Sequence, residues 1–195
     1  MEHHVDLRIQ KTYALVHHAF TELMEEKGFE AFTVGELCEK AMIRRATFYQ
    51  HFSDKYEYFN FYMNEIFQGF RSRVTPGIEA CNVNEYALFM CRELIRFVKK
   101  HARFVSKAME ASVAPTTLTI LLDLLHRDIL QALKNDAGSQ NLSDAQLEGR
   151  ALFFTGGVLS LLYRHLRSNT PIDEEEFIDA VSAFLFTEKH IKAAP

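Results

Sequence analysis

Residues 44–51, RRATFYQH, bring together side chains that form hydrogen bonds in defined geometries. Arginine can donate two hydrogen bonds to O6 and N7 of guanine, and threonine can offer a hydroxyl or a methyl group to a base edge. Tyrosine, histidine and lysine can hold phosphate oxygens. These residue types indicate contact with DNA. The expected contact residues are Thr33, Arg44, Arg45, Thr47, Tyr49, Gln50, His51 and Lys55.

A short helix, from about residue 44 or 45 to residue 51, has to position these side chains. If the apolar residues Phe48 and Phe52 face the core, the helical period turns the arginines, Thr47 and the other polar residues towards solvent, with Tyr49 at the edge. A helix of about two turns is not stable alone in water. We therefore expect neighbouring elements to hold it in place.

The element before it is a second helix, from about residue 34 to residue 41. Thr33 is suited to cap its N-terminus, with Glu36 as the reciprocal partner of a capping box. Two helices joined by a turn of three or four residues, the second with an exposed basic face, form a helix-turn-helix. The N-termini at Thr33 and at Lys55 add main-chain donors for phosphate oxygens.

The rest of the chain also shows helical periodicity and helix start signals. Helices are expected over about residues 7–27, from Ser53 or Asp54 to before Pro76, over 83–100, within 101–112, over 115–133, over 144–167, and from 174 onward. Four of these signals are capping residues: Ser53 or Asp54, Asn82, Ser143 and Asp173. With only 8 Gly and 4 Pro in 195 residues, the sequence predicts an all-α protein.

Composition narrows the class of protein further. The chain carries a formal charge of −4, yet between Lys40 and Lys55 four basic residues stand against one acidic residue, a local excess of three positive charges. The acidic remainder limits indiscriminate binding to nucleic acids. Three widely spaced cysteines favour a reducing cytosol, and with no apolar run long enough to span a membrane we expect a cytoplasmic protein.

The segment FTVGELCEKAMIRRATFYQHFSDKYEYF, residues 32–59, resembles the DNA-binding signature of the TetR/AcrR family of bacterial transcriptional regulators. The resemblance covers about residues 7–59. It implies that Arg44, Arg45, Thr47 and Gln50 face base edges, and that Tyr49, His51 and Lys55 touch phosphates. It also implies a helix-turn-helix domain in residues 1–54, and a helical domain in residues 55–195 that binds an effector and dimerises.

By the same resemblance, the protein is a homodimeric regulator, expected to be a repressor, that binds a palindromic operator and responds to an unidentified small-molecule effector. Its last two long helices are expected to pair with their copies in a four-helix bundle. The turn departs from the family pattern at Met42, where glycine is usual, so a left-handed backbone there would cost roughly 1 kcal/mol. Arg44 stands where serine often caps the third helix, and Gly35 lacks a side chain that reaches DNA in some relatives.

Other residues admit a functional and a structural interpretation. The phenylalanines are mainly core residues, and the alternative interpretation is an apolar effector pocket lined by Phe97, Phe104, Phe153 and Phe154, with His126 as a polar point. The pairs His3-His4 and His17-His18 lack the i, i+4 spacing of metal ligands, so no metal and no cofactor are expected.

Two other classes of protein compete with the regulator. An enzyme is disfavoured because the sequence lacks a nucleophile elbow, a phosphate-binding glycine loop and a HExxH motif. A helical co-regulator of the same fold, acting through a protein partner without operator recognition of its own, stays open because of the departures at Gly35, Met42 and Arg44. Specific retention of a palindromic duplex distinguishes these possibilities.

Overall fold

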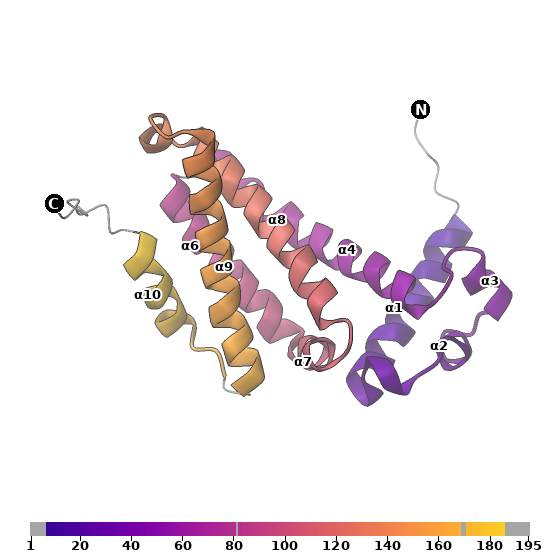
Figure 1. Cartoon of the computed structure of the whole chain (residues 1–195). Coiled ribbons are helices and arrows are strands. Elements are labelled where there is room, and N and C mark those ends of the chain that lie inside the picture. Colours follow the sequence, from indigo (N-terminus) through magenta and orange to yellow (C-terminus); the bar gives the residue numbers. More distant parts are fainter. Residues whose placement is uncertain (1–6, 81, 169–170, 186–195) are drawn as a thin grey trace, which may run out of the picture. The chain divides into compact units, whose positions relative to one another are not determined.

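The computed structural model of the chain describes residues 7–80, 82–168 and 171–185, and all the secondary structure in these ranges is helical (Figure 1). This confirms the all-α prediction. The elements are α1 (Leu7–Lys27), η1 (Phe29–Ala31), α2 (Val34–Lys40), α3 (Arg45–Tyr49), α4 (Lys55–Val74), α5 (Gly77–Ala80), α6 (Val83–Lys100), α7 (Ala102–Glu110), α8 (Ala114–Asn135), η2 (Ala137–Ser139), α9 (Asp144–Ser168) and α10 (Glu174–Leu185).

The chain divides into two compact units that are not contiguous in sequence. Unit 1 comprises Met1–Ile66 and Ala102–Thr117, and unit 2 comprises Phe67–His101 and Leu118–Pro195. Unit 1 therefore contains α1 to α3, the first part of α4, α7 and the first residues of α8. Unit 2 contains the last turns of α4, most of α8, and α5, α6, α9 and α10.

Unit 1 has an aromatic core. Phe20 of α1 is fully buried, and its ring centroid lies 5.0 Å from that of Tyr58 and 5.1 Å from that of Tyr62, both on α4. Helix α7 packs on α1 and adds Phe104, whose ring lies 5.4 Å from Tyr62. Figure 1 shows α2 and α3 beside α1 and the start of α4, so this core supports both short helices.

Unit 2 is held by apolar packing and by polar contacts between helices. Helix α10 packs against α6, and Arg92 of α6 donates to Glu174 of α10 over 3.3 Å. The ring of His165 on α9 lies 6.1 Å from that of Phe177 on α10. The core includes buried residues from α6, α8, α9 and α10, among them Met90, Leu94, Leu125, Ile129, Val158 and Ile178.

Local capping chemistry fixes most helix starts where the sequence predicted them. The Asn82 side chain accepts a hydrogen bond from the Glu85 amide over 3.0 Å, and Asp173 accepts from the amides of Glu175 and Glu176. The predicted pair Ser143 and Gln146 forms a capping box. Helix α3 is shorter than the predicted 44–51, and η1, α5 and η2 were not predicted.

Within the described ranges, no single helix is long and apolar enough to cross a membrane. Taken as one sharply bent pair, α7 and α8 together have the length and the apolar composition of a membrane-spanning segment.

Candidate DNA-binding interface

A reciprocal cap fixes the start of α2. The Thr33 hydroxyl accepts a hydrogen bond from the Glu36 amide over 3.2 Å, and Glu36 Oε2 accepts from the Thr33 amide over 2.9 Å. Lys27 Nζ donates to Glu36 Oε1 over 2.8 Å. Chiefly through this Lys27 bond, and then through Thr33, the pKa of Glu36 is lowered to about 2. The predicted capping box is thus confirmed, and Thr33 lies exposed at the helix N-terminus.

The turn between α2 and α3 requires a left-handed residue. Met42 has φ 53° and is 84% exposed, and it is the only non-glycine residue with positive φ in the described part of the chain. The Ile43 amide bonds Cys38 O over 2.9 Å and the Met42 amide bonds Glu39 O over 3.0 Å. These two bonds are the Schellman pattern, in which glycine is usual at the left-handed position. Met42 therefore carries the strain that the sequence predicted for a left-handed backbone at this position.

Helix α3 is held on one side and exposed on the other. Phe48 and Phe52 are buried, and their ring centroids lie 5.8 Å and 5.0 Å from that of Tyr58 on α4. This confirms that the two phenylalanines hold the short helix against its neighbours. The candidate contact residues lie on the other side. Four of them are exposed, Arg44, Arg45, Tyr49 and Gln50, and two are half-buried, Thr47 and His51.

The Arg45 side chain crosses the turn and lies against α2 at Gly35. A Cβ atom added to Gly35 would stand 2.9 Å from Arg45 Cζ, closer than real contacts of this kind. The glycine therefore leaves room for the guanidinium at the start of α2, close to the exposed cap at Thr33. Sequence reasoning singled out both residues but did not connect them, because they are ten positions apart and only the folded turn brings them together.

His51 is oriented by α1. Its Nδ1 lies 3.4 Å from the Tyr13 hydroxyl, and the two rings meet edge to face with centroids 5.4 Å apart. The Tyr13 ring also contacts Phe52 and Phe61, at 5.8 Å and 5.2 Å between centroids. A half-buried histidine held in this way keeps one ring nitrogen for a further partner.

Lys55 is engaged within the fold. Its Nζ donates to Phe29 O over 2.8 Å and to Phe32 O over 3.0 Å, and it lies 4.6 Å above the centroid of the Phe29 ring. The lysine thus ties the start of α4 to the η1 turn that leads into Thr33. Its two hydrogen bonds use donors that a phosphate contact would need, so the structure gives Lys55 a positioning role that sequence reasoning missed.

The sequence between Lys40 and Lys55 has an excess of three positive charges, but fewer of these charges are available at this surface. Lys40 lies 3.0 Å from Glu26 and 3.3 Å from Glu22, which offset its charge. Asp54 caps α4 through the amides of Tyr56 and Glu57, at 2.8 Å each. The exposed positive charge of the helix-turn-helix therefore comes mainly from Arg44 and Arg45.

Residues 18–60 match the sequence model of the bacterial regulatory proteins of the tetR family. By this match, residues 18–60 are a DNA-binding segment of the TetR family type. The match covers α2, α3 and the turn between them, the elements that present the exposed arginines.

Solved structures extend the likeness to almost the whole fold. FadR from Bacillus subtilis in complex with stearoyl-CoA aligns with a TM-score of 0.67 and 15% identity, covering 91% of this chain and 100% of that one. NalD, the secondary repressor of the MexAB-OprM multidrug efflux pump in Pseudomonas aeruginosa, aligns with a TM-score of 0.63 and 15% identity. The alignment covers 92% of this chain and 95% of NalD. FadR from Bacillus halodurans, a fatty acid degradation regulator, aligns with a TM-score of 0.62 and 16% identity. The alignment covers 92% of this chain and 97% of that FadR chain. No curated protein sequence matches the chain significantly.

The five residues considered for an effector pocket have different surroundings. Phe104 belongs to unit 1, where it is buried against α1 and α4. In unit 2, Phe97 is half-buried with its ring 6.1 Å from that of Phe67, and His126 Nε2 lies 3.1 Å from Glu148 Oε1. Phe153 is 74% exposed and Phe154 is half-buried. Phe104 therefore has a core role in unit 1, and Phe153 points to solvent.

Cysteines and histidines have structural surroundings where the structure describes them. Cys38 and Cys91 are buried free thiols, as predicted, whereas Cys81, His3 and His4 lie outside the described residues. His17 Nδ1 lies 2.7 Å from the Tyr58 hydroxyl, and burial lowers the pKa of this histidine. No group of three His, Cys, Asp or Glu side chains that could hold a metal occurs in the described ranges.

Sequence reasoning missed a buried polar group in unit 2. Asp128 on α8 is 1% exposed, and Arg71 Nε of α4 donates to its Oδ1 over 3.0 Å. The signal was present in the pattern: Asp128 continues the buried helical stripe of Leu121 and Leu125, where an apolar residue is usual. A buried carboxylate at such a position needs partners, which the sequence does not identify.

Proposed function

We propose that the chain is a ligand-responsive transcriptional repressor that binds a palindromic operator as a homodimer. Residues 1–54 would supply DNA recognition, and residues 55–195 effector binding and dimerisation. One observation carries the proposal: α3 is held by two buried phenylalanines and presents two exposed arginines beside the capped N-terminus of α2. The protein would act in the cytoplasm, without catalysis and without a cofactor.

Base recognition would depend on the arginines, Thr47 and Gln50, and phosphate binding on Thr33, Tyr49 and His51. Exposed arginine can donate two hydrogen bonds to guanine in the major groove, and a helix N-terminus offers amides to phosphate. Lys55 would contribute chiefly by fixing η1 and the start of α2, and its interaction with phosphate would come second.

A second copy of the chain would supply the other half-site. On α9, Phe153 is 74% and Leu152 47% exposed, and added Cβ atoms at Gly149, Gly156 and Gly157 meet no neighbouring atom within 4 Å. An exposed aromatic residue beside small residues suits close helix packing. In a two-fold dimer the recognition helices would lie one DNA turn, or a multiple of it, apart.

The ligand response and the repressor role rest on likeness. One similar structure is named as a complex with stearoyl-CoA and another as a repressor of an efflux pump. An effector that binds one arrangement of the dimer more tightly would shift the population away from the DNA-binding state. Helices α4 and α8 both begin in unit 1 and end in unit 2, so each is a covalent path for such a coupling.

The test is selection of random duplex DNA on the purified protein, with competitor nucleic acid at moderate salt, followed by sequencing. We expect a palindrome with half-sites about one turn apart. Arg45→Ala should lose about 1–3 kcal/mol of binding free energy and relax the preference at one base pair. Gly35→Ala should alter the preference at that same base pair, since an alanine Cβ would displace the Arg45 guanidinium.

A co-regulator that acts through a protein partner is the second candidate. The observation in its favour is that Lys40 and Lys55 are both engaged within the fold, which leaves few free cations for phosphate. Retention of no sequence above background, by a protein that is folded and dimeric, would favour this candidate over the repressor.

A further inference from the structure

Tyr13 of α1 packs its ring against unit 1 and directs its hydroxyl to the end of the recognition helix. The ring is half-buried, and its centroid lies 5.8 Å from that of Phe52 and 5.2 Å from that of Phe61. The hydroxyl lies 3.4 Å from Nδ1 of His51. A phenylalanine would make the same ring contacts, so packing alone does not require a hydroxyl at this position.

His51 is held at its main chain and at its ring. Its amide donates to Phe48 O over 3.0 Å, and the Phe52 amide donates to the same oxygen over 3.0 Å. The imidazole meets the Tyr13 ring edge to face, with centroids 5.4 Å apart. The ring therefore leaves the end of α3 in a defined orientation, with Nδ1 towards α1.

The hydrogen bond at Nδ1 has a chemical consequence at Nε2. A neutral imidazole carries a proton on one nitrogen and accepts a hydrogen bond at the other. The bond made by one nitrogen thus decides which nitrogen is protonated. If the Tyr13 hydroxyl donates to Nδ1, the proton is on Nε2, which can then donate to a partner outside the fold. A phosphate oxygen, which only accepts, is such a partner.

We propose that Tyr13 is a positioning residue for DNA binding, because its hydroxyl holds His51 in the form protonated on Nε2. His51 would then bind a phosphate oxygen as a neutral donor. The protonation of the ring needs no DNA, whereas the phosphate contact rests on the proposed function. A neutral donor adds affinity without releasing a counterion, so it supplements the few exposed positive charges of the helix-turn-helix.

The opposite arrangement is a charged His51 that donates from Nδ1 to the Tyr13 oxygen. The surroundings of the ring favour the neutral form. Two other histidines, His18 and His126, lie within ion-pair distance of a glutamate, at 3.6 Å and 3.1 Å. His51 has the rings of Tyr13 and Phe52 as neighbours, and in the described part of the chain it forms no ion pair with a carboxylate.

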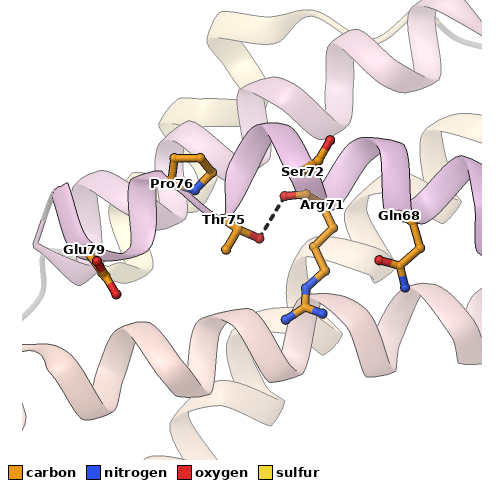
Figure 2. Close-up of a pocket in the computed structure, with 6 residues that line it drawn as sticks. All are labelled: Gln68, Arg71, Ser72, Thr75, Pro76 and Glu79. Atoms are coloured by element: carbon orange, nitrogen blue, oxygen red, sulfur yellow. Dashed lines mark hydrogen bonds between the residues drawn. The ribbon is translucent and has the colours of Figure 1, made fainter. Parts of the chain in front are cut away.

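The chain offers two control variants for Tyr13→Phe. Tyr62→Phe removes another hydroxyl from the same aromatic core, one that pairs with Thr21 over 2.6 Å. Thr75→Val removes a hydroxyl in unit 2, at the open hollow in Figure 2, where Thr75 donates to Arg71 O over 2.9 Å. Neither hydroxyl contacts His51, so both variants should bind DNA as wild type does.

The protonation of His51 is measured on the full chain without DNA, by long-range ¹H–¹⁵N correlation NMR at about pH 8. The signals of His51 are those absent from His51→Ala. Wild type should carry the proton on Nε2, and Tyr13→Phe, which keeps the ring, should add a population protonated on Nδ1. Wild-type His51 protonated on both nitrogens, or a tautomer that Tyr13→Phe leaves unchanged, would overturn the proposal.

The phosphate contact is measured with two duplexes of equal length, the selected palindrome and one of arbitrary sequence, over a range of salt concentrations. Tyr13→Phe should weaken both about 5-fold, the effect of one neutral hydrogen bond, because every sequence offers phosphates. The salt dependence should not change. In a His51→Ala background, Tyr13→Phe should have no further effect. Thermal denaturation checks that each variant is folded.

Two results would contradict the contact. A further loss on Tyr13→Phe in the His51→Ala background would mean that Tyr13 acts through packing, and a salt dependence lower by about one unit would mean that His51 binds as a cation. The proposed function is judged separately. If no palindrome is retained but Tyr13→Phe weakens binding to the arbitrary duplex as expected, the contact stands and operator recognition falls. If Tyr13→Phe binds a recovered palindrome as wild type does, operator recognition stands and the role of Tyr13 falls. Binding to neither duplex would overturn both.

Discussion

Arg45 and Lys55 are both basic residues of the helix-turn-helix segment, but their surroundings differ. The Arg45 guanidinium lies at the surface of α2 over a glycine, whereas the Lys55 ammonium is bound by two main-chain carbonyls beside an aromatic ring. A charge that is satisfied inside the fold contributes to stability, and a free charge can release counterions from DNA. The two residues should therefore respond differently to substitution.

Lys55→Met should lower the free energy of unfolding by about 1.5–3 kcal/mol, since it removes hydrogen bonds from a charged donor to Phe29 O and Phe32 O. Urea denaturation measures this change, with Lys11→Met at an exposed lysine of α1 as control. If stability were unchanged while the salt dependence of DNA binding fell by about one unit, Lys55 would be a phosphate contact instead.

At the scale of the element, the cap of α2 gives a pH-dependent contribution to stability. The folded-state pKa of Glu36, about 2, lies below its ordinary value of 4.5. The contribution of the Glu36 carboxylate to the free energy of unfolding is therefore fully present above about pH 4.5 and is lost as the pH falls towards 2. Wild type should be more stable than Glu36→Gln at pH 6, and the difference should disappear towards pH 2.

Denaturation at a series of pH values measures this difference. Glu39→Gln, which removes an exposed carboxylate of the same helix from outside the cap, is the control for the loss of one negative charge. A Glu36→Gln difference that stayed constant from pH 6 to pH 2.5 would mean that the carboxylate does not stabilise the cap in its charged form.

The turn between α2 and α3 should become more stable with glycine. Met42→Gly removes a Cβ from a backbone at φ 53° and should raise the free energy of unfolding by about 1 kcal/mol. Glu39→Gly, inside α2, should lower it by a similar amount. Thermal denaturation of both variants tests this; a loss of stability in Met42→Gly would show that the Met42 side chain makes a contact worth more than the strain.

Sequence predicted the elements well where their chemistry is local. Thr33, Asn82, Ser143 and Asp173 cap the helices that they were expected to begin, because a cap involves only three or four consecutive residues. Contacts such as those of Lys55 with Phe29 and of Arg71 with Asp128 were not foreseen. They join residues 26 and 57 positions apart, and tertiary packing alone decides which pairs meet.

At the scale of the whole molecule, the proposed dimer depends on α9. Phe153→Glu should raise the dimer dissociation constant by about 30-fold or more, since it would bury a charge at the centre of a two-fold contact. Sedimentation equilibrium measures this, and affinity for a palindrome should fall in parallel. Leu15→Glu, at an exposed residue of α1, is the control. A Phe153→Glu protein that stays dimeric would place the interface elsewhere.

Unit 1 is built from two separate segments of the chain, and this limits how a DNA-binding domain can be transferred between relatives. Helix α7 packs on α1, Phe104 completes the aromatic core, and Ser112 donates to Glu30 through its amide over 3.1 Å and its hydroxyl over 2.5 Å. An N-terminal segment transplanted alone onto a relative would leave Phe20 and Tyr62 against foreign side chains. A working chimaera therefore needs residues 102–117 as well. Because both segments build the core of unit 1, a single contiguous block of sequence is not expected to transfer DNA specificity between relatives.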